Sequence, residues 1–153
     1  MTDHGTGGSS AKKIAAVVEF STRVEDACRG VGEAVAGFRP GDGGPSLKEL
    51  VDAAGSADRV RMPAALERLR HGGDPRAVFA STSVTKDVPG LDPALREWSE
   101  HLIRLKHCRA EALDRFRAAG DAARVLIDPW FDADLAFLAT LVAAVDARRT
   151  DVG

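Results

Sequence analysis

Residues 11–38 read AKKIAAVVEFSTRVEDACRGVGEAVAGF, and this stretch is the strongest indication of the fold. Apolar or small side chains recur in it at alternating intervals of three and four residues. Such spacing is typical of an amphipathic helix that packs along one face. The positions on that face are Ile14, Val17, Ser21, Val24, Cys28, Val31, Val35 and Phe38.

Two further stretches predict long amphipathic helices. Asp92-Pro93 is a helix-starting pair, and residues 93–119 repeat the alternating spacing until Gly120, which favours a helix end. The positions on this second seam are Leu95, Trp98, Leu102, Leu105, Arg109, Ala112, Phe116 and Ala119. Asp128-Pro129 then starts a last helix that ends near Arg149.

The segment between the first two long helices predicts a small helical insert over residues 46–90. It follows the glycine-rich linker 41–45, and Ser46 with Glu49 forms a capping box that opens a short helix ending at Gly55. A second short helix is expected from Pro63 to Arg70 and a third from 74 to 80, with a loop or brief extended piece over 81–90. The predicted fold is therefore all-α: an elongated bundle of three long amphipathic helices with this insert. Residues 1–10 are expected to be a disordered lead-in to a single domain over 11–150.

Composition excludes several classes of protein. The 153 residues are 44% hydrophobic and 29% charged with a net charge of −2, which is ordinary for a globular protein and argues against binding nucleic acid or anionic membranes through bulk charge. Two cysteines supply neither a disulfide framework nor a zinc ribbon. No signal peptide or membrane span is recognisable, so a cytoplasmic protein is expected, and the residue usage is typical of a GC-rich bacterial genome.

The seams favour a non-catalytic interaction module. Three helices bury less apolar surface than four, so we expect self-association through 11–38 and 93–119. An unidentified protein is the second expected partner, and no cofactor is expected. Candidate contact residues are Trp130 and Phe131, which follow Pro129 and cannot both face one core, and Arg68 and Arg70 in the insert. Asp128, Asp132 and Asp134 form an acidic tip beside the aromatic pair, which we interpret first as charge that complements a helix dipole and then as a partner-facing rim.

Arg96 and His101 carry the enzyme alternative. Their Arg-x4-His spacing resembles the motif of HEPN ribonucleases, a family of small all-α dimers, although Glu97 is a poor neighbour for a phosphate. The resemblance implies a composite site in which His101 acts as acid–base and Arg96 stabilises phosphate charge. The interaction-module hypothesis instead places His101 on an open solvated face, where its replacement by alanine should leave stability nearly unchanged.

Two more alternatives remain open from the sequence. Glu97, His101, His107 and Glu111 are spaced as pairs of metal ligands on one helix, although the other helices offer no matching histidine. Residues 46–76 resemble a degenerate helix-turn-helix with its turn at Gly55, and this segment is locally basic. The second pattern would make the chain a DNA-binding regulator.

Overall fold

The computed structural model describes residues 3–80 and 92–152, and every element in these ranges is a helix. The predicted all-α fold is therefore confirmed. The elements are α1 (Asp3–Val18), α2 (Phe20–Ala27), α3 (Glu33–Gly37), α4 (Leu47–Arg70), α5 (Arg76–Ala80), the 3-10 helix η1 (Pro93–Leu95), α6 (Trp98–Ala119), the 3-10 helix η2 (Gly120–Leu126) and α7 (Ile127–Val152). No helix in the described ranges is both long and apolar enough to cross a membrane.

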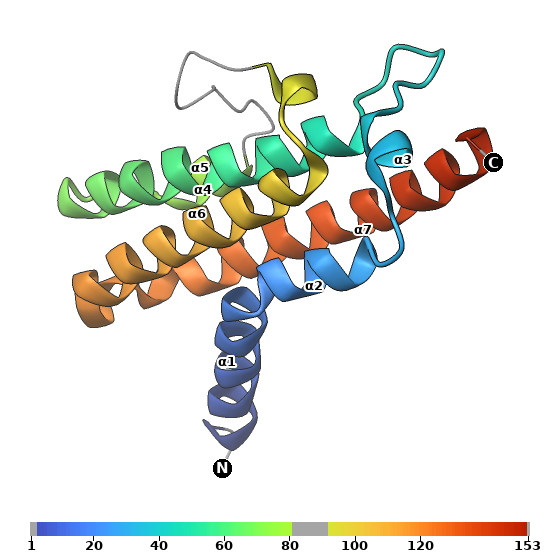
Figure 1. Cartoon of the computed structure of the whole chain (residues 1–153). Coiled ribbons are helices and arrows are strands. Elements are labelled where there is room, and N and C mark those ends of the chain that lie inside the picture. The colour runs from blue at the N-terminus through green and yellow to red at the C-terminus, as the bar shows by residue number, and fades with distance from the viewer. Residues whose placement is uncertain (1–2, 81–91, 153) are drawn as a thin grey trace.

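The bundle contains four helices from this one chain. Figure 1 shows α2, α4, α6 and α7 lying side by side, with α4 and α6 running in one direction and α7 in the other, while α1 projects away from the bundle. The most extensive packing joins α4 to α6. The first and second predicted seams therefore pack mainly against α4 and α7 of the same chain. No second copy is needed to complete the bundle.

The single helix predicted over 11–38 is wrong in its continuity. The structure divides this stretch into α1, α2 and α3, and α1 begins at Asp3, inside the predicted disordered lead-in. The break after α2 lies where Gly30 has a φ of +81°, a left-handed conformation that glycine adopts without steric cost. The predicted burial of seam positions is confirmed near the break, because Val24 and Cys28 lie in the core.

The predicted small insert is also wrong, because residues 47–70 form one helix of 24 residues. The capping box at its start is confirmed: the Glu49 amide donates to Ser46 Oγ at 3.1 Å and the Ser46 amide donates to Glu49 Oε1 at 2.9 Å. Gly55 lies inside the helix, and a Cβ built there would lie 2.7 Å from Arg104 Nη1 on α6. Gly55 thus leaves room for the guanidinium end of Arg104 and does not end α4, and Pro63 is also accommodated within the helix. The loop predicted over 81–90 lies outside the described residues.

The second long helix begins later than predicted. Asp92 does cap a helical turn, since Asp92 Oδ1 accepts from the Ala94 amide at 3.0 Å, but this turn is the short η1 and α6 starts only at Trp98. Leu95 is consequently 71% exposed instead of lying on a buried seam. The predicted end at Gly120 is confirmed, with a φ of +75°.

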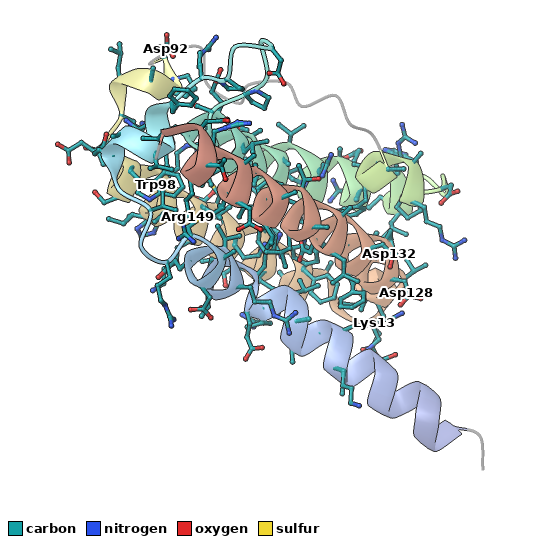
Figure 2. The ribbon with its side chains drawn as sticks, turned by 90° about the vertical axis from the view of Figure 1, so that its right-hand side faces the viewer. Lys13, Asp92, Trp98, Asp128, Asp132 and Arg149 are labelled. Atoms are coloured by element: carbon teal, nitrogen blue, oxygen red, sulfur yellow. The ribbon has the colours of Figure 1, made fainter. Side chains whose placement is uncertain are left out.

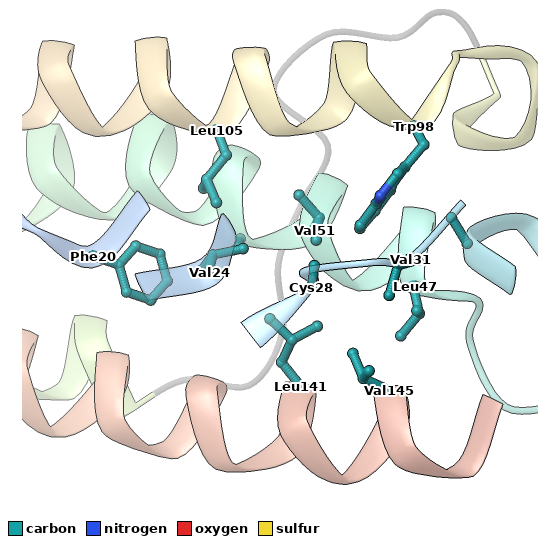
Figure 3. Packing of buried hydrophobic residues seen from close by; sticks show 12 residues of the cluster. Phe20, Val24, Cys28, Val31, Leu47, Val51, Trp98, Leu105, Leu141 and Val145 are labelled. Atoms are coloured by element: carbon teal, nitrogen blue, oxygen red, sulfur yellow. The ribbon is translucent and has the colours of Figure 1, made fainter. Parts of the chain in front are cut away.

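The core consists of two apolar clusters. The first includes Phe20, Leu47, Trp98, Leu105 and Leu141. Figure 3 shows side chains of this cluster from α2, α4, α6 and α7 converging on one another. The second contains members of α1, α4, α5, α6, η2 and α7: Val17, Met62, Ala65, Phe79, Ala112, Leu113, Ala123, Leu126 and Trp130. Both cysteines are buried, and neither is part of a disulfide.

Candidate functional site

A buried ion cluster centred on Arg109 contacts both apolar clusters. Arg109 Nε and Nη2 donate to the two carboxylate oxygens of Asp58 at 2.8 and 3.0 Å. Its Nη1 and Nη2 donate to those of Asp134 at 2.7 and 2.8 Å, and Nη1 also donates to the Val17 carbonyl at 2.9 Å. A guanidinium has five N–H groups, and all five are used here. The cluster is thus a closed hydrogen-bonding unit.

Aromatic rings enclose the same guanidinium. The Arg109 Cζ atom lies 4.2 Å from the centroid of the Phe20 ring and 4.7 Å from that of Trp130, within cation–π range. Phe20 belongs to the first apolar cluster and Trp130 to the second. Arg109 therefore links both halves of the core, and the surrounding rings keep water from its charge.

Two buried carboxylates are hydrogen-bonded to the one guanidinium of Arg109, and the positive charge of Arg61 acts on both of them as well. Burial raises the pKa of Asp134 to about 6, against the lowering effect of its bonds to Arg109. For Arg109, burial opposes the charged form, but the neighbouring Asp58 and Asp134 carboxylates outweigh it and raise the pKa. We conclude that Arg109 is always charged and that Asp134 takes up a proton in mildly acidic solution.

Replacing Asp134 with asparagine is expected to remove a loss of folding stability that the wild type suffers as pH rises. Between about pH 4 and pH 6 the native Asp134 holds a proton that the unfolded chain has released, so this group makes the wild type less stable as pH rises. We expect the free energy of unfolding of Asp134→Asn, relative to wild type, to rise by about 2–3 kcal/mol between pH 4 and pH 7. Urea unfolding at several pH values measures it, with the exposed Asp114→Asn as control. A pH-independent difference would contradict the raised pKa.

A half-open groove of about 980 Å³ lies directly over the ion cluster, between α4 and α7. Its lining includes Asp58, Arg109 and Asp134, the rings of Phe79 and Trp130, and alanines of both helices. Clefts of this size with apolar walls and few polar groups are typical of ligand sites. Because all five N–H groups of Arg109 are bonded within the cluster, its guanidinium has no donor left for a ligand in the groove.

The outer face of α7 is the second candidate surface. Residues 135–144 read LAFLATLVAA and contain no charged side chain. Leu135 and Val142 on this segment are nevertheless 45% and 48% exposed, and Ala139 between them is also exposed. None of these three lines the groove. Helices that are apolar on all sides are typically buried, so this face has the composition of a contact surface.

The structure brings Arg96 and His101 near one carboxylate without forming the predicted catalytic cleft. Arg96 Nη1 lies 3.8 Å and His101 Nδ1 4.0 Å from Asp52 Oδ1. His101 is fully buried, and its Nε2 lies 2.8 Å from the Pro93 carbonyl oxygen. Burial lowers the pKa of His101, which keeps the ring neutral. The HEPN-like arrangement therefore lacks an accessible histidine, and the open solvated face expected under the alternative hypothesis is wrong as well.

The metal-site and DNA-binding alternatives have no geometric support. Among the described residues, no three His, Cys, Asp or Glu side chains converge as metal ligands, and the predicted set is split because His101 is buried while Glu97, His107 and Glu111 are exposed. The helix-turn-helix fails because Gly55 is inside α4 and provides no turn. Continuous helix over 47–70 leaves no separate recognition helix in that segment.

The predicted partner-contact residues lie in different environments. Trp130 is 2% exposed and packs against Phe79 and Phe116, so its side chain is not an exposed anchor. Phe131 is half-buried under Lys13, whose Nζ lies 5.5 Å from the ring centroid. Arg68 and Arg70 are exposed at the end of α4, where Arg70 pairs with Glu67 and Arg68 donates to the Asp74 carbonyl.

Sequence reasoning missed the central role of the ion cluster. Arg109 occupies a position on the predicted apolar seam, and a charged residue there requires a buried counter-ion. That signal indicates that counter-ions exist but does not identify them, and the sequence pattern assigns Asp134 to an acidic tip that complements a helix dipole. Comparisons of the chain with protein-family models, curated proteins and solved structures found no match.

Proposed function

We propose that this chain is a non-catalytic helical interaction module that self-associates by packing α7 antiparallel against α7 of a second copy. The observation that carries the proposal is the uncharged segment 135–144, whose Leu135 and Val142 remain 45% and 48% exposed. Covering these side chains removes apolar surface from water, which is the main driving force of association. The surface differs from the two seams predicted for self-association, because those seams are already packed within the chain.

Charge at the two ends of α7 supports a second copy as the occupant. Asp128, Leu135, Val142 and Arg149 follow one another at intervals of seven residues and therefore share a helix face. Figure 2 shows Asp128 and Arg149 near opposite ends of α7. In an antiparallel pair that places Leu135 opposite Val142 of the other copy, Asp128 lies opposite Arg149. The face is thus self-complementary, as a twofold interface requires.

The charged ends of α7 favour the antiparallel orientation of the two copies, but they add little to the affinity of the dimer. In the single chain, Asp128 already pairs with Lys13 at 3.0 Å and Arg149 donates to the Arg29 carbonyl. Exposed ion pairs contribute little free energy. Asp132 and Asp146 on the same side of α7 carry like charge, which weakens the pair. We therefore expect a reversible, concentration-dependent dimer and not an obligate one.

Replacing Leu135 and Val142 with glutamate tests the proposal without disturbing the core, because both side chains are exposed. Wild type is expected to approach twice the chain mass of 16.2 kDa in a sedimentation concentration series, whereas Leu135→Glu/Val142→Glu should remain at 16.2 kDa. Ile103→Glu is the matched control, since Ile103 on α6 is 55% exposed and lies on another helix. A wild type that stays monomeric throughout the series would refute self-association.

A charge exchange tests the antiparallel orientation. Arg149→Asp places two aspartates opposite each other and should weaken the dimer, and adding Asp128→Arg should restore it by exchanging the signs. Restored association in the double variant supports the predicted register. A double variant weaker than Arg149→Asp would exclude it while leaving association through the apolar segment to be judged from the glutamate variants.

A further inference from the structure

Small and aromatic side chains make the groove between α4 and α7 long and apolar. Its lining contains six alanines, drawn from α4, α5 and α7, and four aromatic rings that include Trp130 and Phe137. Leu50 and Arg61 both line it from α4 and are eleven residues apart, so the groove is about 16 Å long. One elongated apolar molecule matches this shape better than a compact one.

The charged groups beneath the groove balance one another. Asp58 and Asp134 each accept hydrogen bonds from Arg109. The charge of the half-buried Arg61 interacts favourably with the same two carboxylates. At pH 8 two guanidinium groups therefore offset two carboxylates, because the pKa of Asp134 is about 6. A charged ligand group placed here would leave water without gaining a counter-ion of its own, which is costly.

The other polar side chains of the lining also give little to a charged ligand. The hydroxyl of Thr140 donates to the Ala136 carbonyl at 3.1 Å, within α7. Arg76 and Asp132 are exposed at the rim, where Figure 2 shows Asp132, and exposed ion pairs contribute little free energy. A ligand in this groove is therefore held mainly by the apolar surface that it buries.

We propose that the groove binds one uncharged single-chain lipid of the long-chain alcohol class, with its alkyl chain between α4 and α7 and its hydroxyl group at the open side. Burial of the chain supplies the affinity, and a head group without charge loses nothing against the balanced ion cluster. The site does not rest on the self-association proposed above, because Leu135 and Val142 do not line the groove.

A brominated alcohol locates the bound chain, because bromine quenches the fluorescence of a tryptophan that it contacts. Trp130 lines the groove, whereas Trp98 belongs to the first apolar cluster and does not. Trp98→Phe leaves Trp130 as the one tryptophan of the chain. Dodecanol brominated at its terminal carbon should quench this variant in a saturable titration with one molecule per chain, and should not quench Trp130→Phe. Unchanged emission of Trp98→Phe, or quenching that does not saturate, would overturn the proposal.

Displacement of the brominated alcohol at pH 8 tests the length and charge of the ligand. From octanol upwards, each added methylene should lower the Kd about fourfold, until the chain reaches the length of dodecanol, which is similar to that of the groove. Tetradecanol should bind no more than slightly more tightly. Dodecanoate and dodecyltrimethylammonium should each bind at least about tenfold more weakly than dodecanol. An affinity that keeps rising to tetradecanol, or tighter binding of either charged probe, would overturn the proposal.

Variants on three surfaces show where the alcohol binds. Ala136→Phe fills the groove from an exposed position and should abolish dodecanol binding, whereas Ala110→Phe on the exposed side of α6 should not. Leu135→Glu/Val142→Glu should bind dodecanol as tightly as wild type, whether or not it changes self-association. Loss of binding in that double variant would place the alcohol on the outer face of α7 and overturn the proposal, as would full binding by Ala136→Phe.

Discussion

Replacing Arg109 with alanine is expected to lower the free energy of unfolding by about 3–5 kcal/mol, the usual loss when one member of a buried ion pair is removed. The physical reason is that Asp58 and Asp134 would remain buried with no cation between them. Without the Arg109 cation the buried Asp134 carboxylate takes up a proton more readily, so the loss should be larger at pH 8 than at pH 5. Urea unfolding at both pH values measures the effect.

Two variants make this result interpretable. Arg115→Ala removes an exposed arginine from the same helix and should change stability by less than about 0.5 kcal/mol. Arg109→Met combined with Asp58→Leu and Asp134→Leu removes all three charges together and should recover much of the lost stability, because apolar side chains of similar size replace the cluster. An Arg109→Ala protein as stable as wild type would show that the cluster contributes nothing to the fold.

Replacing His101 with alanine should destabilise the protein by about 2–4 kcal/mol, because it leaves a cavity in the core and removes the hydrogen-bond contact between His101 Nε2 and the Pro93 carbonyl. This outcome reverses the sequence-based expectation of a nearly silent change. His101 has a lowered pKa, so the unfolded chain binds its proton first as pH falls below about 6.5. The stability that the buried neutral ring gives the wild type therefore decreases in acid. The difference in unfolding free energy between wild type and His101→Ala should be smaller at pH 5 than at pH 8.

His107→Ala is the matched control for this measurement. His107 lies on the same helix but is exposed, so its replacement should change the unfolding free energy by less than about 0.5 kcal/mol. If His101→Ala left the unfolding free energy unchanged, the result would support a solvent-exposed His101, as the sequence pattern predicts.

Local signals predicted the ends of helices well. The Ser46 capping box and the Gly120 helix end both depend on residues within one turn of the chain, and both are present in the structure. The same kind of reasoning failed inside α4. Gly55 and Pro63 have low helix propensity, but packing against α6 outweighs that local cost and keeps the helix continuous.

The candidate surfaces depended on longer-range information. Trp130 and Phe131 follow a proline at a predicted helix start, which marked them as a pair that cannot both face one core. The structure buries Trp130 between Phe79 and Phe116 and leaves Phe131 half-buried. Which of the two faces inward is set by α5 and α6, and no pattern within the last helix contains that information.

The sequence by itself determined the all-α class, the main seam positions and the presence of an arginine on one seam. Only the tertiary structure decided that four helices complete the bundle and that Arg109 meets Asp58 and Asp134. Those partners lie 51 and 25 residues away along the chain. Helical periodicity arises from bonds within a few residues and is therefore visible in the sequence. The pairing of buried charges and the groove above them arise from how separate helices pack, which local spacing does not encode.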